Sequence, residues 1–301
     1  MGEAGALKIT MGPIPYLWSG EKWRDFYYRI AESGHVDAVT LGEVVCSKRD
    51  HFTRHFLPDV VERLTRNGKS VAVASLALIT QEREAAATRR LAAEAALAEA
   101  NDLSALRLLS GRPHLVGPFV NVYNGATARL LAKKGATRIC LGPELPAASI
   151  GAITAGAPEI EYELIAFGRL PLAISARCAH ARAKGHTKDN CQFVCGEEPD
   201  GLDVDTLDGQ PFLTVNGVQT MSRHCQVLLG DLDAVAAMGI THLRLSPQDC
   251  DMLAVAELYA GVRDGALAAE EAIRRLGEVY PNAPFANGFL HGEAGMNWVA
   301  A

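Results

Sequence analysis

Short apolar runs alternate with helical patterns through the first half of the chain. The runs have the length and composition of strands, and the segments between them repeat their apolar residues at helical spacing. The predicted strands are 7–14, 36–43, 70–77, 114–124 and 137–145. The predicted helices are 21–33, 51–68, an Ala-rich helix over 81–100 that Thr80 can cap, 125–135 and 147–155. Repeated strand-helix units of this kind imply parallel strands joined by helical crossovers.

The alternation is interrupted once and then returns. Residues 159–175 read as one or two strands that lead into a cysteine-containing loop, and 202–217 read as a hairpin with Asp208-Gly209 at its turn. A helix near 230–238 and a strand over 241–247 follow. Ser246 and Pro247 then predict the start of another helix, as its cap and its first position.

These units predict an α/β fold of the TIM-barrel type. Six to eight strand-helix units in 301 residues suit such a barrel better than an open sheet. No Pro-rich or Ser-rich linker divides the chain, so we expect residues 1–301 to form one barrel-like domain. The cysteine loop and the hairpin would be an insertion at about 176–220.

Composition narrows the functional classes. The formal net charge is −6 with no basic stripe, which argues against nucleic-acid binding. No apolar run approaches the length of a membrane helix, and the first residues lack a targeting signal, so we expect no transmembrane segment and a cytoplasmic location. In a reducing compartment, clustered thiols are more often ligands or redox groups than disulfides.

Four of the seven cysteines form the strongest chemical signal. Cys178, Cys191 and Cys195 lie within eighteen residues of one polar loop, and Cys46 stands alone in GEVVCSKR. Thiolates at such spacing suit a four-iron, four-sulfur cluster. Tetrahedral zinc is the alternative, with His180 or His186 as a possible nitrogen ligand, and unrelated surface thiols are the third interpretation.

The barrel interpretation brings these cysteines together. Functional groups of such barrels lie in the loops that follow the carboxyl ends of the strands. Cys46 follows one predicted strand and Cys178 follows another. Residues far apart in sequence would then meet at one mouth of the barrel.

Other residues are weaker candidates. Cations that flank the cysteines would offset the negative charge of a cluster, although a solvated loop explains any one of them equally simply. These cations are Lys48, Arg49, Arg177 and Arg182. Glu43 would orient a substrate or cap nearby amides, and His291 lies in a Gly-rich segment near the C-terminus. Cys140, Cys225 and Cys250 lie alone in apolar elements and are expected to pack in the core.

Several of these segments together resemble one known family. They are GEVVCSKR at 42–49, FGRLPLAISARC at 167–178, the loop to CQFVC at 191–195, the following EEPDGL, and the terminal NGFLHGEAGMNW. They are similar to the collagenase-like peptidase superfamily, and within it to the UbiV-like branch. The resemblance covers nearly the whole chain, and the four-cysteine pattern is its most specific part.

The resemblance implies a cofactor, a partner and a reaction. Cys46, Cys178, Cys191 and Cys195 each fall on a cysteine that binds a [4Fe-4S] cluster in UbiV-like proteins. The family implies a heterodimer with a UbiU-like protein. Such pairs hydroxylate the aromatic ring of a polyprenylated quinone precursor in ubiquinone biosynthesis without dioxygen, with a metabolite such as prephenate as the oxygen source.

Two other functions remain open at this point. One is a zinc-stabilised barrel that serves as a scaffold or binding module. The other is a cysteine-dependent peptidase, although AISARCAHARAKGH lacks the serine-glycine and tyrosine-serine-glycine elements of the superfamily's peptidases. A thiol nucleophile also needs a base held by a third group, and the sequence does not place His180 in that role.

Overall fold

Short runs of Val, Ile, Leu and Ala form parallel strands here because the fold buries both of their faces. The computed structural model describes residues 7–300. Its parallel strands are β1 (Lys8–Met11), β2 (Ala38–Leu41), β3 (Ser70–Ala74), β4 (Ala98–Ala100), β5 (His114–Val116), β6 (Ala136–Cys140), β7 (Glu161–Ile174) and β11 (His242–Leu245). Each strand from β1 to β6 pairs in parallel with the strand that follows it in the numbering.

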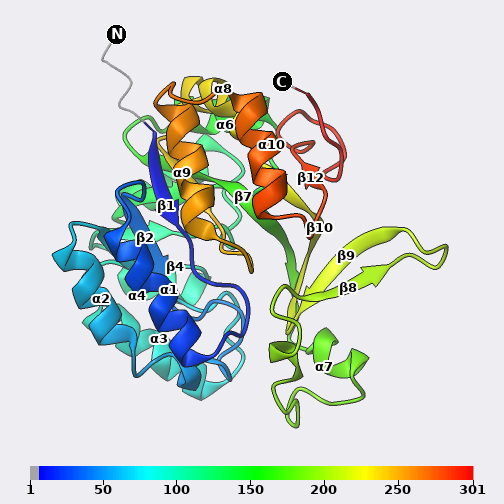
Figure 1. Cartoon of the computed structure of the whole chain (residues 1–301). Helices are drawn as coiled ribbons and strands as arrows, with labels where there is room; N and C mark the ends of the chain where they lie inside the picture. The colour runs from blue at the N-terminus through cyan, green and yellow to red at the C-terminus, as the bar shows by residue number, and fades with distance from the viewer. Residues whose placement is uncertain (1–6, 301) are drawn as a thin grey trace.

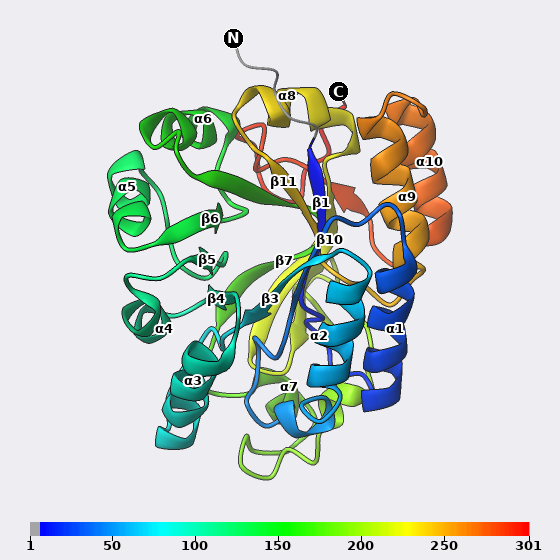
Figure 2. The ribbon, with the colours of Figure 1, turned by 90° about the vertical axis from the view of Figure 1, so that its left-hand side faces the viewer.

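β11 closes this sheet into a barrel. It pairs in parallel with β1, from Lys8↔His242 to Met11↔Leu245, and with β7, beginning at His242↔Glu163. Within residues 7–300 the result is a closed barrel of eight parallel strands ringed by helices (Figures 1 and 2). The TIM-barrel prediction is confirmed.

The helices lie outside the strands and turn their apolar faces inward. They are α1 (Gly20–Glu32), α2 (Leu57–Arg66), α3 (Glu82–Glu94), α4 (Leu103–Leu109), α5 (Gly125–Lys133), α6 (Ala147–Gly156), α8 (Leu232–Ala237), α9 (Met252–Arg263) and α10 (Ala269–Val279). Side-chain caps from Ser19, Asp102 and Asn124 begin α1, α4 and α5. Among the described helices, none combines the length and apolarity needed to cross a membrane.

β7 is longer than the other barrel strands and belongs to two sheets. Glu163 to Phe167 pair with β11 in the barrel, and Phe167 to Ile174 pair antiparallel with β10 (Gln219–Val227). Gly168 stands at the change, with φ +121°. A Cβ there would lie 2.7 Å from Ser246 Cβ, so only glycine lets β7 leave the barrel so close to the end of β11.

The segment between β7 and β10 lies beyond one end of the barrel (Figure 1). It contains α7 (Ala179–Ala183), a 3-10 turn η2 (Val194–Gly196), and the strands β8 (Leu202–Asp205) and β9 (Pro211–Asn216). β8 and β9 pair antiparallel and confirm the predicted hairpin, with Gly209 at φ +79° in its turn. A short β12 (Phe285–Ala286) pairs with β10.

The predicted helix over 81–100 is wrong in its last six residues. α3 ends at Glu94, and residues 98–100 form β4 between β3 and β5. The alanines favour a helix locally. As a strand, however, this segment pairs with a neighbour on each side and buries Glu99, and these tertiary contacts outweigh the local preference. Gln81, rather than Thr80, caps α3 in a capping box with Glu84.

Two other helix boundaries differ from the prediction. The predicted helix over 51–68 is a 3-10 turn, η1 (Asp50–Phe52), followed by α2, because Pro58 is tolerated only in the first turn of a helix. Ser246 and Pro247 do not begin α9. That helix starts at Met252, where the Asp251 side chain accepts the N–H of Leu253 at 3.1 Å.

A buried ion cluster crosses the inside of the barrel. Arg244 on β11 donates to Glu99 on β4, with Nη1 at 3.2 Å from Oε1, and to Glu163 on β7 at 2.6 Å. β4 and β11 are on opposite sides of the closed sheet, so this pairing spans the interior. Burial would raise the pKa of Glu163, but the charges of Arg244 and Arg138 outweigh it and lower the pKa to about 2.

The stability of the barrel should fall in mild acid because of His242, which is 2% exposed beside this cluster. Burial and the charge of Arg138 lower the pKa of His242 to about 4. Between about pH 6.5 and 4 the unfolded imidazole therefore binds a proton that the folded one does not, and the free energy of unfolding should drop by up to about 3 kcal/mol. Urea unfolding of the parent and of His242→Asn across this range measures it. A parent and a variant with the same pH dependence would contradict it.

Candidate metal centre

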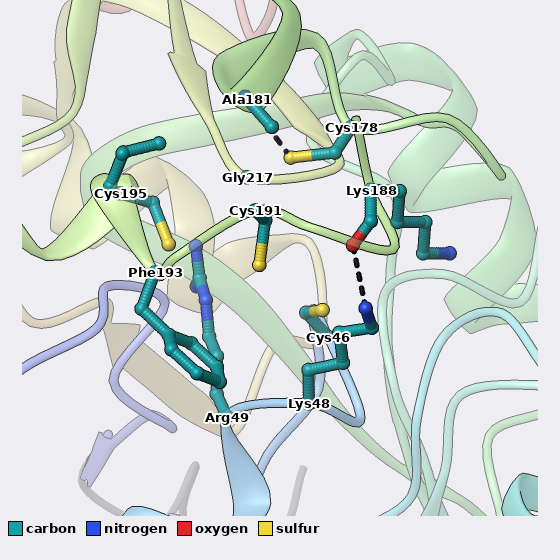
Figure 3. A pocket seen from close by; sticks show the side chains of 11 residues that line it. Cys46, Lys48, Arg49, Cys178, Ala181, Lys188, Cys191, Phe193, Cys195 and Gly217 are labelled. Atoms are coloured by element: carbon teal, nitrogen blue, oxygen red, sulfur yellow. Dashed lines mark hydrogen bonds between the residues drawn. The ribbon is translucent and has the colours of Figure 1, made fainter. Parts of the chain in front are cut away.

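Four thiols from two distant parts of the chain line one pocket (Figure 3). Cys46 lies in the loop that follows β2, and Cys178 precedes α7 after the end of β7. Cys191 precedes the 3-10 turn η2, and Cys195 lies within it. The four cysteines that the sequence marks as candidate ligands therefore all line this site. Their sulfur atoms face the same space (Figure 3).

The loop that carries three of these cysteines is held against the loop that carries the fourth. Gln192 and Phe193 have φ of +49° and +56°, which is unusual for side chains larger than glycine. Phe193 packs edge-on against Phe52, with ring centroids 5.0 Å apart, just after the Cys46 loop. The Lys48 ammonium donates to the Lys188 carbonyl at 2.6 Å (Figure 3). These contacts join the two segments.

Arg49 supplies a buried positive charge at the pocket. It is 2% exposed, and its guanidinium donates to the Pro15 carbonyl at 2.9 Å and to Asn216 Oδ1 at 2.7 Å. Gly217 passes so close that a Cβ there would lie 2.5 Å from Arg49 Nη2. The guanidinium is thus fixed between the barrel and the β9–β10 turn.

Burial shifts the pKa of two of the thiols, those of Cys46 and Cys195. It raises the pKa of Cys46, and the nearby Glu43 carboxylate adds to this while Arg49 opposes it. Burial also raises the pKa of Cys195, again against the charge and hydrogen bond of Arg49. Since a metal ligand must be a thiolate, metal binding here would release protons.

Backbone amides and one carboxylate shape the thiol positions. The Ala181 N–H donates to Cys178 Sγ at 3.3 Å. Glu43 accepts the N–H groups of Val45 and Cys46, each at 2.8 Å, and so forms the turn that presents Cys46. Of the two roles considered for Glu43, the structure bears out amide capping.

The other candidate side chains lie outside the pocket. Arg177 and Arg182 are exposed and do not line it, so Lys48 and Arg49 are the flanking cations that do. His180 is buried with Nε2 at 2.9 Å from Glu198 Oε2, and His186 does not line the pocket. His291 pairs with Asp231 at 2.9 Å, away from the thiols. Lys188, Phe193 and Gly217 belong to the site although nothing in their sequence context marks them.

The remaining cysteines lie apart from this site. Cys140 is buried in β6 and Cys225 is buried in β10, where packing is their evident role. Cys250 precedes α9 and is partly buried against Met252.

The size and spacing of the pocket limit what it can hold. It contains about 350 Å³ free of atoms, part of it open to solvent, but only about 20 Å³ is wide enough for the centre of a water molecule. Within residues 7–300, no three His, Cys, Asp or Glu side chains lie close enough together to hold a single metal ion.

Comparison with known proteins places the chain in a family. The model of peptidase family U32 matches residues 24–300. The chain belongs to peptidase family U32. This membership confirms the superfamily to which the sequence segments were similar, and it leaves the branch within the family open.

Solved structures provide a more distant comparison. N-acetylneuraminate lyase from Fusobacterium nucleatum, complexed with pyruvate, has 8% identity and a TM-score of 0.47, with 91% of this chain and 79% of that one covered. Phospho-2-dehydro-3-deoxyheptonate aldolase from Thermotoga maritima has 11% identity and a TM-score of 0.47, with 93% and 72% covered. A truncated 3-deoxy-D-arabino-heptulosonate 7-phosphate synthase from the same organism has 10% identity and a TM-score of 0.43, with 93% and 90% covered. None of these likenesses bears on the chemistry of the thiol pocket.

Replacing Arg49 should weaken the fold around the thiols. Arg49→Met leaves the Pro15 carbonyl and Asn216 with fewer buried partners, and we expect the free energy of unfolding to fall by about 2 kcal/mol. Arg54→Met is the matched control, because Arg54 is exposed and forms only a surface ion pair with Asp50, worth about 0.5 kcal/mol. Chemical denaturation measures both. Equal losses in the two variants would contradict the role given to Arg49.

Proposed function

We propose that this chain is the iron-sulfur subunit of a heterodimer that hydroxylates the aromatic ring of a polyprenylated quinone precursor without dioxygen. The observation that carries the proposal is the convergence of Cys46, Cys178, Cys191 and Cys195 on one pocket. The proposed partner is a UbiU-like protein, and the proposed pathway is ubiquinone biosynthesis. Partner, pathway and substrate come from the resemblance to UbiV-like proteins within the family.

The ligands at the pocket bear on the choice between a cluster and a zinc ion. Zinc in structural sites takes four ligands, either four thiolates or a mixture of thiolates and imidazoles. A [4Fe-4S] cluster takes four thiolates at the corners of a cube. The pocket is lined by four thiols, which is the ligand set of a cluster. Neither His180 nor His186 lines the pocket to provide the nitrogen of a Cys₃His zinc site.

The charges around the pocket also suit a cluster. A cube with four thiolate ligands is an anion, and positive side chains and N–H donors near its sulfurs stabilise the negative charge and tune the reduction potential. Arg49, Lys48 and Lys188 all line the pocket. The Ala181 N–H already points at Cys178 Sγ.

The number of protein ligands indicates what such a cluster would do. With four thiolates, each iron has a protein ligand, and the cofactor then supplies one-electron transfer rather than an open site for substrate. The residues of this chain would hold the cluster and shield it. We therefore place the ring chemistry on the partner or at the interface with it.

Hydrolysis of peptides, which the family's name suggests, has less support in this chain. A thiol nucleophile needs a base within hydrogen-bonding reach and a third group that orients the base. His180, two residues from Cys178, is buried and bonded through Nε2 to Glu198. Arg49, rather than a histidine, faces Cys195.

The cluster is tested by its colour and its iron content. Protein purified without oxygen should be brown, absorb broadly near about 400 nm and contain about four irons per chain. Changing any of the four pocket cysteines to alanine should remove most of the absorbance. Cys140→Ala is the control, because Cys140 is buried in β6 outside the pocket. A colourless protein with one zinc would contradict the cluster, and colour lost with Cys140 but kept without Cys46 would contradict the ligand set.

The partner is tested by coexpression. A UbiU-like protein expressed with this chain should copurify with it through anaerobic size-exclusion chromatography as a one-to-one complex. The chain alone is the control for self-association. If this chain elutes as a monomer at high concentration in the presence of the other, the heterodimer is wrong even when the cluster is present.

A further inference from the structure

A large cavity separates α2 from α3 on the outside of the barrel. Neighbouring helices pack in pairs elsewhere in the ring: α1 with α2, α3 with α4, α5 with α6, and α9 with α10. The space between α2 and α3 contains about 1,960 Å³ free of atoms, part of it open to solvent, and about 790 Å³ of it is accessible to the centre of a water molecule. The accessible part has the size of a ligand site in other proteins, about 300–1,000 Å³. Figure 2 shows both helices from this side.

The walls of this cavity are mostly apolar. They come from α2, from the end of β3 and its following loop, and from α3. The apolar lining includes Leu57, Val61, Val73, Leu76, Ala87 and Leu91. Val61 and Leu91 are only half-buried, although they face inward from helices of a closed barrel. Because the walls are mostly apolar, replacing water in this space by an apolar group is favourable.

The cavity is long. Its lining on α3 runs from Arg83 to Glu94, twelve residues that span eleven rises of about 1.5 Å each, or about 16 Å. At the end near the start of α3, the half-buried Ser47 hydroxyl donates to the buried Glu84 at 2.6 Å. Toward Ala95 the lining consists of apolar side chains and the exposed Arg90 and Glu94.

The Ser47 end of the cavity adjoins the loop that presents Cys46. Glu43 and Ser47 line the cavity, and Cys46 between them lines the thiol pocket on the other face of the same loop. The cavity and the thiol pocket share no lining residue. The two sites are therefore adjacent but separate.

We propose that the cavity between α2 and α3 binds the single apolar chain of an amphiphile, acyl or isoprenoid, with the polar head of the ligand at the Ser47 end. The length of the cavity, its mostly apolar walls and the hydrogen-bonded Ser47 and Glu84 at one end fit this class of ligand. A compact polar metabolite would leave the apolar walls uncovered. The proposal does not rest on the cluster, since no cysteine lines the cavity.

The test is direct binding of two probes to the full-length protein purified without oxygen. Oleate and geranylgeraniol are titrated separately by displacement of a fluorescent fatty acid. We expect saturable binding of at least one probe. Binding of oleate alone indicates a site for an acyl chain, and binding of geranylgeraniol alone indicates a site for an isoprenoid chain. Binding of both indicates a site that accepts either kind of apolar chain.

Cavity-filling variants locate the site. Ala87→Phe on α3 and Val61→Phe on α2 should each weaken binding of the probe that binds the parent at least tenfold. The two variants are made separately, so that the test remains valid if one of them fails to fold. Ala93→Phe is the matched control, because Ala93 is an exposed residue of α3 outside the cavity lining, and it should bind as the parent does. Failure of both probes to bind, or equal affinity in the filled and control variants, would overturn the proposal. Iron content, measured on the same samples, reports separately on the cluster.

Discussion

The position of the cysteine loop depends on one strand, β7, that pairs with neighbours both within the barrel and beyond its end. β7 closes the barrel through its first half and continues past the barrel as the partner of β10. Gly168 makes this continuation possible, because any side chain at that point would collide with Ser246. The strand then delivers Cys178 beyond the end of the barrel, on the side where the loop after β2 presents Cys46. Without this extension the cysteine loop would have no fixed position relative to the barrel.

The barrel itself is held from both sides of its sheet. Apolar side chains pack between the strands and the helices, while the interior contains a pairing of Arg244 with Glu99 and Glu163. A buried ion pair contributes little net stability compared with an apolar core, but removing one partner leaves an uncompensated charge. The pairing therefore constrains which strands face one another across the interior.

Family and function are separate conclusions for this chain. The match to peptidase family U32 covers most of the sequence, yet the thiols lie beside a buried arginine rather than an oriented base. A fold and a family name do not identify a reaction, since the chemistry depends on which groups converge at the site. Here the converging groups are four sulfurs and three cations, and the proposed cluster site rests on this arrangement. The apolar cavity on the other face of the Cys46 loop adds a second region that the family name does not describe.

Apolar periodicity and thiol spacing are local properties that can be read without knowing contacts. They were enough to predict the fold class, most of the strands and helices, and the four cysteines that line the pocket. Tertiary structure decided the rest. β4 lies within an Ala-rich stretch that favours a helix, and it becomes a strand only because β3 and β5 lie on either side of it. Among the four cations near the cysteines, only the folded chain distinguishes Arg49, which bonds to Pro15 and Asn216, from Arg177 and Arg182, which remain exposed. The cavity between α2 and α3 is also invisible in the sequence, because an empty space depends on how far apart two helices pack and no single residue encodes that distance.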